Sequence, residues 1–145
     1  KQPSVDVIID EEKVVGLTSM AAFSRLAAQI DKMKADLNNV LSEIKSAGKS
    51  IAAFGAPAKA TTLMYHFGLD ASTIEFIVDD SPLKQGLYSP GLHVPVISAD
   101  EMYQRAPDYL IILAWNFAEA IMNNHKQFLE NGGHFIVPVP EVKVY

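Results

Sequence analysis

The sequence predicts an α/β fold, in which an open, mostly parallel sheet of about five strands carries helices on both faces and follows a long amphipathic helix. Two patterns carry this prediction. From residue 50 onward, short apolar segments alternate with helical segments, and such alternation calls for parallel strands joined by right-handed crossovers. Residues 109–114 are almost continuously apolar, as in a strand covered on both faces. Together they favour a doubly wound, Rossmann-like arrangement.

The individual elements have their own start and stop signals. The helical pattern of residues 58–67 ends at Gly68, while Ser98 and Glu101 form a capping box that opens a helix stopping before Pro107. A segment rich in Pro and Gly occupies residues 81–91. The predicted strands are 50–54, 74–78, 94–97, 109–114 and 134–139, and the predicted shorter helices are 58–67, 98–106 and 117–129.

Residues 19–47 are predicted to form one helix, because their apolar residues recur three and four positions apart. Thr18 or Ser19 supplies the N-cap, and Gly48 ends the helix. At about 1.5 Å per residue the helix is about 43 Å long, more than a small sheet needs. We expect it to cover part of the sheet and extend beyond it; the alternative is a coiled coil that makes a homo-oligomer. The apolar positions are Phe23, Leu26, Ile30, Met33, Leu37, Val40, Leu41 and Ile44.

Residues 1–18 are predicted to be an N-terminal extension that links to a domain upstream, and residues 19–145 to form the Rossmann-like domain. Val5, Val7 and Ile9 alternate along the extension, which predicts an extended segment that pairs with a sheet edge or lies across a neighbouring domain. The chain begins with Lys1 and shows no signal-peptide pattern. We therefore expect it to be a piece of a longer protein.

Composition narrows the class of protein. With 145 residues, of which 49% are hydrophobic and 20% charged, the chain can bury a sizeable core. A formal net charge of −5 and the lack of any Lys- or Arg-rich run argue against nucleic acid as a partner. No apolar run reaches the ~20 residues of a membrane span, so no membrane partner is expected. Absence of cysteine fits the cytoplasm, and the four scattered histidines predict no metal site.

The segment 51–62 carries the strongest functional signal. A short apolar strand runs into Gly55 and a helix starts directly afterwards, which leaves unpaired N–H groups and the positive end of the helix facing outward. Proteins commonly hold phosphate or carboxylate at such a corner. Lys59 adds a cation, and Thr61 and Thr62 add hydroxyl donors. The expected ligand is an anionic small molecule, above all a nucleotide.

Segments that follow the other strands should reach the same edge, because ligands in such folds bind beyond the carboxyl ends of the strands. Asp79 lies 24 residues after Gly55 (79 − 55), near the spacing at which an acidic residue meets a ribose hydroxyl. The loop holds a single glycine, however, so the GxGxxG fingerprint of dinucleotide binding is absent. Three alternatives stay open: Asp79 as a turn cap, residues 84–86 as a solvated turn, and Trp115 as a packing side chain.

The ordered set of motifs resembles one known family. It comprises GAPAK at 55–59, VD at 78–79, KQG at 84–86, PG at 90–91, VPV at 94–96, AWN at 114–116, GG at 132–133 and FIVP at 135–138. The set is similar to the C-terminal domain of S-adenosylmethionine-dependent sugar C-methyltransferases, which methylate a carbon of nucleotide-linked keto-deoxysugars. The likeness covers about residues 23–142.

This resemblance implies a three-part enzyme: a zinc-binding N-terminal region, a central S-adenosylmethionine-binding domain, and this domain, which helps to form the sugar-nucleotide cleft. The methyl-donor site and the catalytic base would lie upstream of Lys1, so no cofactor and no catalytic residue is assigned to this chain. Two alternative functions for this chain are that of a non-catalytic nucleotide- or CoA-binding module and that of a structural docking domain. The candidate substrate-binding residues are Gly55, Ala56, Pro57, Ala58, Lys59, Thr61, Thr62, Asp79, Lys84, Gln85, Gly86, Tyr88, Trp115 and Asn116.

Overall fold

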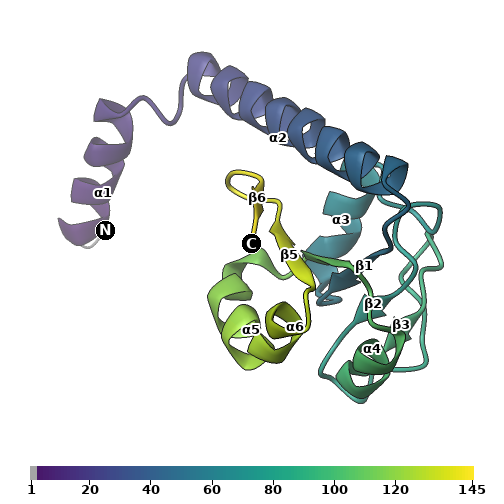
Figure 1. The fold of residues 1–145 in the computed structure, drawn as a ribbon. Coiled ribbons are helices and arrows are strands. Elements are labelled where there is room, and N and C mark those ends of the chain that lie inside the picture. Colours follow the sequence, from purple (N-terminus) through teal and green to yellow (C-terminus); the bar gives the residue numbers. More distant parts are fainter. Residues whose placement is uncertain (1–2) are drawn as a thin grey trace. The chain divides into compact units, whose positions relative to one another are not determined.

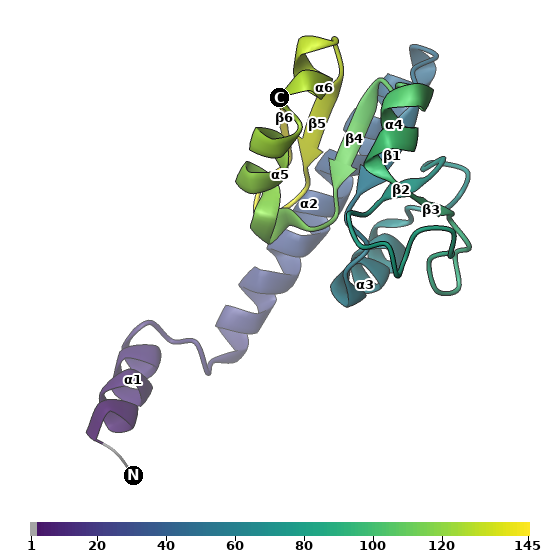
Figure 2. The same ribbon diagram turned by 90° about the horizontal axis from the view of Figure 1, so that it is seen from below.

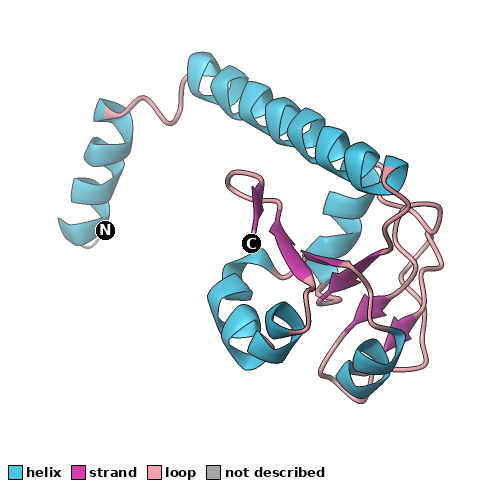
Figure 3. Ribbon diagram, viewed as in Figure 1, coloured by secondary structure: helices cyan, strands magenta, loops and turns pink. Residues whose placement is uncertain are grey.

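The computed structural model describes residues 3–145, and the chain divides into two units, Lys1–Lys32 and Met33–Tyr145. The larger unit is built on a six-stranded sheet in the order β3-β2-β1-β4-β5-β6 (Figures 1 and 3). All neighbouring strands are parallel except β5 and β6, which are antiparallel. The strands are β1 (Ile51–Phe54), β2 (Ile77–Val78), β3 (Val96–Ile97), β4 (Tyr109–Ile112), β5 (His134–Val137) and β6 (Lys143–Val144).

Helices cover both faces of the sheet, so the predicted open α/β fold is confirmed, with six strands in place of about five. Figures 1 and 2 show α3 on the same face as the C-terminal half of α2, and α4, α5 and α6 on the opposite face. The helices are α1 (Pro3–Val14), α2 (Met20–Ser46), α3 (Ala58–Phe67), α4 (Ala99–Arg105), the 3-10 turn η1 (Trp115–Phe117), α5 (Ala118–Asn124) and α6 (Lys126–Glu130).

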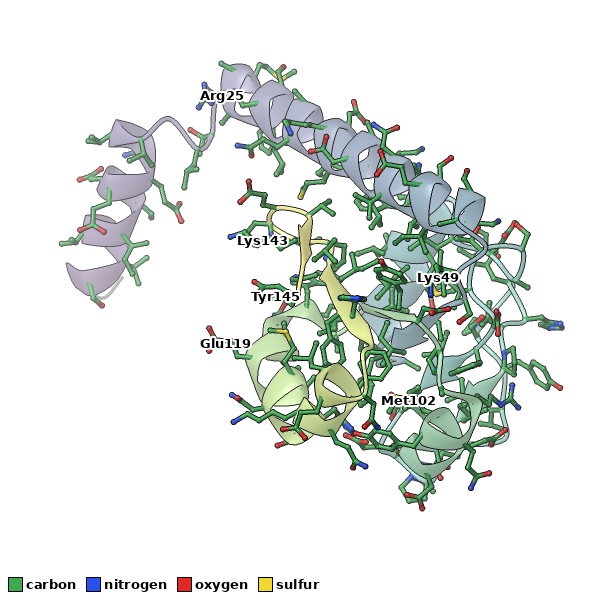
Figure 4. The ribbon with its side chains drawn as sticks, viewed as in Figure 1. Arg25, Lys49, Met102, Glu119, Lys143 and Tyr145 are labelled. Atoms are coloured by element: carbon green, nitrogen blue, oxygen red, sulfur yellow. The ribbon has the colours of Figure 1, made fainter. Side chains whose placement is uncertain are left out.

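Alternate strand residues face the two helical layers. On the face covered by α4, α5 and α6, a buried cluster includes Phe54, Val78 and Phe135. Met102, labelled in Figure 4, lies in the same cluster between α4 and the sheet. On the other face the C-terminal half of α2 buries its apolar stripe, including Leu37, which is fully inaccessible. Strands covered on both sides explain why residues 109–112 are almost continuously apolar.

Helix boundaries follow the signals in the sequence. The long helix begins after Ser19, whose hydroxyl accepts the Ala22 N–H at 3.2 Å, and it ends before Gly48 as predicted. Helix α3 spans the predicted residues 58–67 and is closed by Gly68 at φ +75°. At α4, Ser98 Oγ accepts the Glu101 N–H. The Glu101 side chain pairs with Arg105, so only half of the predicted capping box forms.

The extended segment predicted for residues 4–15 is wrong, because these residues form helix α1. The alternation of Val5, Val7 and Ile9 is short and is broken by Ile8, so it does not define one apolar strand face. A carboxylate in the first turn and Lys13 in the last turn complement the helix dipole. Lys13 also pairs with Asp10 at 2.9 Å.

Three further predictions differ from the structure, one in the middle of the chain and two near the carboxyl end. The single helix predicted for residues 117–129 is η1, α5 and α6, with a break at His125, whose φ and ψ are −116° and 35°. The strand predicted for residues 74–78 is only the two residues of β2. The strand predicted for residues 134–139 ends at Val137, and the chain then returns as β6. A two-residue strand carries no measurable period, so the sequence gives no signal for β6.

The amino ends of β1 and β4 are tied together by Asp108. Its carboxylate accepts the Lys49 ammonium at 2.8 Å and both the N–H and the hydroxyl of Ser50 at 2.8 Å; Lys49 is labelled in Figure 4. The Lys49 hydrogen bond, followed by those from Ser50, lowers the pKa of Asp108 from 3.8 to about 2. This clamp lies at the edge opposite the carboxyl ends of the parallel strands.

Candidate functional site

The strand order places a switch point between β1 and β4. Strand β2 lies on one side of β1 and β4 on the other, because the chain runs outward from β1 to β2 and β3 and then returns across the sheet to β4. Ligands of doubly wound sheets bind in the crevice outside the carboxyl ends of such strands. Gly55 directly follows β1, and Trp115 lies three residues after the end of β4 at Ile112, so both belong to this edge, as the sequence predicts.

Gly55 is the turn that lets β1 and β4 approach closely at this edge. Its φ is +91°, and a Cβ atom built on it would lie 2.6 Å from the Cβ of Ala114. The Gly55 N–H donates to the Val78 carbonyl at 2.7 Å. Pro57 then serves as the N-cap of α3 without a side-chain hydrogen bond. The start of α3 therefore lies directly beside the switch point.

Asp79 is bound to its own chain on both carboxylate oxygens. Its Oδ2 accepts the Ala56 N–H at 2.7 Å and the Lys84 ammonium at 3.0 Å, and its Oδ1 accepts the Ser81 N–H at 2.9 Å. The residue is only 7% exposed. Burial opposes the charged form, but these hydrogen bonds and the Lys84 charge outweigh it, so the pKa of Asp79 lies below its usual value.

The segment 84–86 is a fixed turn against the sheet. The Gln85 side-chain amide donates to the Asp79 carbonyl at 2.9 Å, and the Gly86 N–H donates to the Val96 carbonyl at 2.9 Å. This turn is therefore anchored at β2 through Asp79 and at β3 through Val96. Any direct contact of these residues with a ligand stays a prediction.

A pocket of about 230 Å³ lies between the start of α3 and the segment that follows Lys84. It unites six of the predicted site residues: Ala56, Pro57, Ala58, Thr61, Lys84 and Tyr88. Sequence reasoning missed much of the apolar lining, which includes Met64, Leu87, Pro90 and Val96. Pro90 and Val96 belong to the PG and VPV motifs that carry the family resemblance, but these motifs do not mark them as pocket wall. Leu87 had no signal beyond its place in the segment 81–91, because an isolated apolar residue in a loop has no periodicity.

Lys59 and Trp115 meet on the β4 side of the same turn. The Lys59 ammonium lies 3.9 Å from the centroid of the Trp115 ring, a cation–π contact. Trp115 and Asn116 line a second, more open hollow of about 430 Å³ together with residues that include Val139 and Tyr145. The predicted residues that line neither of these two hollows are Gly55, Lys59, Thr62, Asp79, Gln85 and Gly86.

A hydrogen-bonded pair, buried His125 and partly buried Tyr103, lies on the sheet face opposite α3. His125 Nδ1 and the Tyr103 hydroxyl are 3.0 Å apart in a hydrogen bond, and the His125 ring packs against Phe54 at 4.8 Å between centroids. Burial lowers the pKa of His125 and raises that of Tyr103. Because Phe54 is the last residue of β1, the His125 ring packs against the sheet directly beside the switch point.

Two general properties of the described chain bear on its function. Within residues 3–145, no helix is both long and apolar enough to cross a membrane. Over the same residues, no three His, Asp or Glu side chains come together as metal ligands would.

The strand order and the helix start at the switch point define a Rossmann-like domain, and a pocket adjoins this edge of the sheet. A family model described as the C-methyltransferase C-terminal domain matches residues 1–140, and the chain belongs to this family. It is also 36% identical over 143 residues to the C-methyltransferase NovU of Streptomyces niveus. That alignment covers 99% of this chain and 34% of NovU, so the chain spans about a third of the length of this relative.

Proposed function

We propose that this chain is the substrate-binding lobe of a cytoplasmic, S-adenosylmethionine-dependent C-methyltransferase that acts on a nucleotide-linked keto-deoxysugar. Its family supports the reaction class. The observation that carries the binding role is the pocket that joins the start of α3 to residues 84–90, where six of the predicted site residues lie together. The lobe orients the substrate and excludes water, which can supply several kcal/mol of barrier reduction.

The charges near the start of α3 suggest which part of such a substrate each region binds. Lys84 lines the pocket but is paired with Asp79, so the pocket has apolar walls and a neutralised cation. An uncharged ring suits it. Lys59 lies over the Trp115 ring rather than on a carboxylate, and it sits in the first turn of α3. A cation there faces the positive end of a helix dipole, which an anionic phosphate would offset.

The state of Asp79 supports a ligand other than S-adenosylmethionine or a dinucleotide. Dinucleotide sites use a carboxylate near this position for the ribose hydroxyls, whereas Asp79 is only 7% exposed and its side chain already accepts three hydrogen bonds from the chain itself. The methyl donor and the base that deprotonates the sugar therefore belong, in this proposal, to the part of the enzyme that this chain does not contain. No residue of this chain is assigned a catalytic role.

An amide NMR titration tests the binding role directly. Thymidine diphosphate-glucose, S-adenosylmethionine and NADH are each added to the chain. We expect shifts only with the sugar nucleotide, confined to residues 55–62 and 79–88. Shifts produced by S-adenosylmethionine or NADH would contradict the proposal, and a chain that responds to none of the three would favour plain scaffolding.

Substitution of Lys59 identifies the anion site. Lys59→Met should weaken binding of thymidine diphosphate-glucose by about tenfold to a hundredfold, since a hydrogen bond to a charged group contributes about 1.5–3 kcal/mol. Lys126→Met is the matched control, because Lys126 is an exposed lysine on α6, on the face away from α3. Equal affinities of the two variants would remove Lys59 from the site.

A docking role is a second candidate for the unit Lys1–Lys32 in particular. Large apolar side chains are open to solvent there; Val14 is 87%, Met20 78% and Phe23 58% exposed. Such a surface suits contact with the S-adenosylmethionine-binding domain of the longer enzyme. Phe23→Ser should then weaken the association of this chain with that domain and leave sugar-nucleotide affinity unchanged. A change in the sedimentation of this chain alone would point to homo-oligomers instead.

A further inference from the structure

Two separate segments of the chain form opposite walls of the pocket. One is the turn around Ala56 and Pro57 after β1, and the other runs from Lys84 to Pro90. Neither segment is a helix or a strand. Backbone hydrogen bonds hold the second segment to β3, from the Gly86 N–H to the Val96 carbonyl at 2.9 Å and from the Val96 N–H to the Leu87 carbonyl at 2.8 Å, but these bonds do not connect it to the Ala56 turn. The Asp79 side chain joins them, because the same oxygen accepts the Ala56 N–H and the Lys84 ammonium.

The carboxylate is specifically required for these contacts. Its two oxygens accept backbone N–H groups on opposite sides, Ala56 at 2.7 Å and Ser81 at 2.9 Å. An asparagine of the same size has one acceptor oxygen and an NH₂ group that only donates, so it can satisfy only one of these two N–H groups. It would also face the Lys84 ammonium without a negative charge. An apolar side chain would leave all three donors unpaired near the pocket.

We propose that Asp79 is a positioning residue, whose buried carboxylate fixes the Ala56 turn and Lys84 relative to each other and so sets the distance between the pocket walls. This inference rests on the proposed substrate-binding function for its effect on affinity. It also changes the role expected for Asp79, from a ligand of a ribose to an internal link. Asp79 itself does not line the pocket, in agreement with an indirect action.

Asp79→Asn tests the proposal, with Asp108→Asn as the matched control. Asp108 also accepts a backbone N–H and a lysine ammonium, but it lies at the opposite edge of the sheet. We expect Asp79→Asn to shift the ligand-free amide signals of Leu87 and Tyr88 in the pocket wall. It should also weaken binding of thymidine diphosphate-glucose about tenfold, a cost of about 1.4 kcal/mol, because the pocket walls lose their fixed spacing. Asp108→Asn should leave both the Leu87 and Tyr88 signals and the ligand affinity unchanged, even if it lowers the stability of the fold as much as Asp79→Asn does.

Each result has a defined meaning. Unmoved Leu87 and Tyr88 signals in Asp79→Asn would overturn the proposal, as would affinities equal to those of Asp108→Asn. If the unmodified chain binds no sugar nucleotide, the proposed function fails, and the Leu87 and Tyr88 signals alone decide the role of Asp79. If Asp79→Asn does not fold, Lys84→Met replaces it, since this change keeps both backbone hydrogen bonds; unchanged pocket signals there would again overturn the proposal.

Discussion

A methyl group added at Gly55 would test how closely β1 and β4 approach at the edge that carries the candidate site. Gly55 has φ +91°, and a left-handed conformation costs an alanine about 1–2 kcal/mol. The new Cβ would lie 2.6 Å from the Ala114 Cβ and 3.2 Å from the Ala114 nitrogen. Relief of such an overlap costs about 1–3 kcal/mol more. We therefore expect Gly55→Ala to lower the free energy of unfolding by about 2–5 kcal/mol.

Gly68→Ala separates the two contributions. Gly68 has φ +75° and no atom within 4 Å of its added Cβ, so only the backbone strain of about 1–2 kcal/mol applies. Urea unfolding followed by circular dichroism compares the variants. With a slope of about 1–3 kcal/mol per molar urea, an excess of about 2 kcal/mol separates the midpoints by about 1 M. Equal destabilisation would refute the argument that contact with Ala114 restricts position 55.

Two further predictions concern pH. The pKa of Asp108 falls from 3.8 to about 2 on folding, so its stabilisation is complete above pH 3.8 and is lost as the pH falls toward 2. Because the Asp108 side chain is 33% exposed, solvent screening reduces its contribution to the free energy of unfolding to about 1–2 kcal/mol. Asp108→Asn should therefore be less stable than the unmodified chain by this amount at pH 6, and the difference in stability should disappear near pH 2. Burial lowers the pKa of His125 below 6.5, so below pH 6.5 the unfolded chain takes up the proton first and stability falls. His125→Gln should unfold with a weaker pH dependence between pH 7.5 and 5, and a slope identical to that of the unmodified chain would contradict this account.

The sequence was informative wherever one physical signal dominated. Helix α3 matches the prediction residue for residue, because a proline before it and a glycine after it limit the helix from both sides. Helix α2 was predicted nearly as well, since its apolar stripe repeats over 27 residues. The prediction failed where the pattern was short. Helix α1 was read as extended from three residues. No proline or glycine marks the break at His125, whose side chain is hydrogen-bonded to Tyr103.

The candidate site shows the same limit. The order of the strands brought Gly55, Asp79 and Lys84 to one edge, as predicted. What the sequence could not reveal was the partner of each polar group. Asp79 was weighed as a turn cap or a ligand contact, and its hydrogen bonds run to backbone N–H groups of Ala56 and Ser81. Every residue but proline carries such a group, so side-chain identity leaves the choice of partner undetermined.

The two-residue strands at either end of the sheet limit how the sheet can grow. An exposed edge of unpaired N–H and C=O groups is a template for the strand of another molecule, and natural sheets shorten or charge their edges to prevent this. Here one edge is β3, where the Val96 N–H and carbonyl already pair with Leu87 and Gly86, and the other is β6, which begins with a lysine, Lys143. Strand β6 also covers the side of β5 that would otherwise stand open. Addition of a foreign strand is therefore disfavoured at both ends, which protects a strongly apolar sheet from aggregation by edge-to-edge pairing.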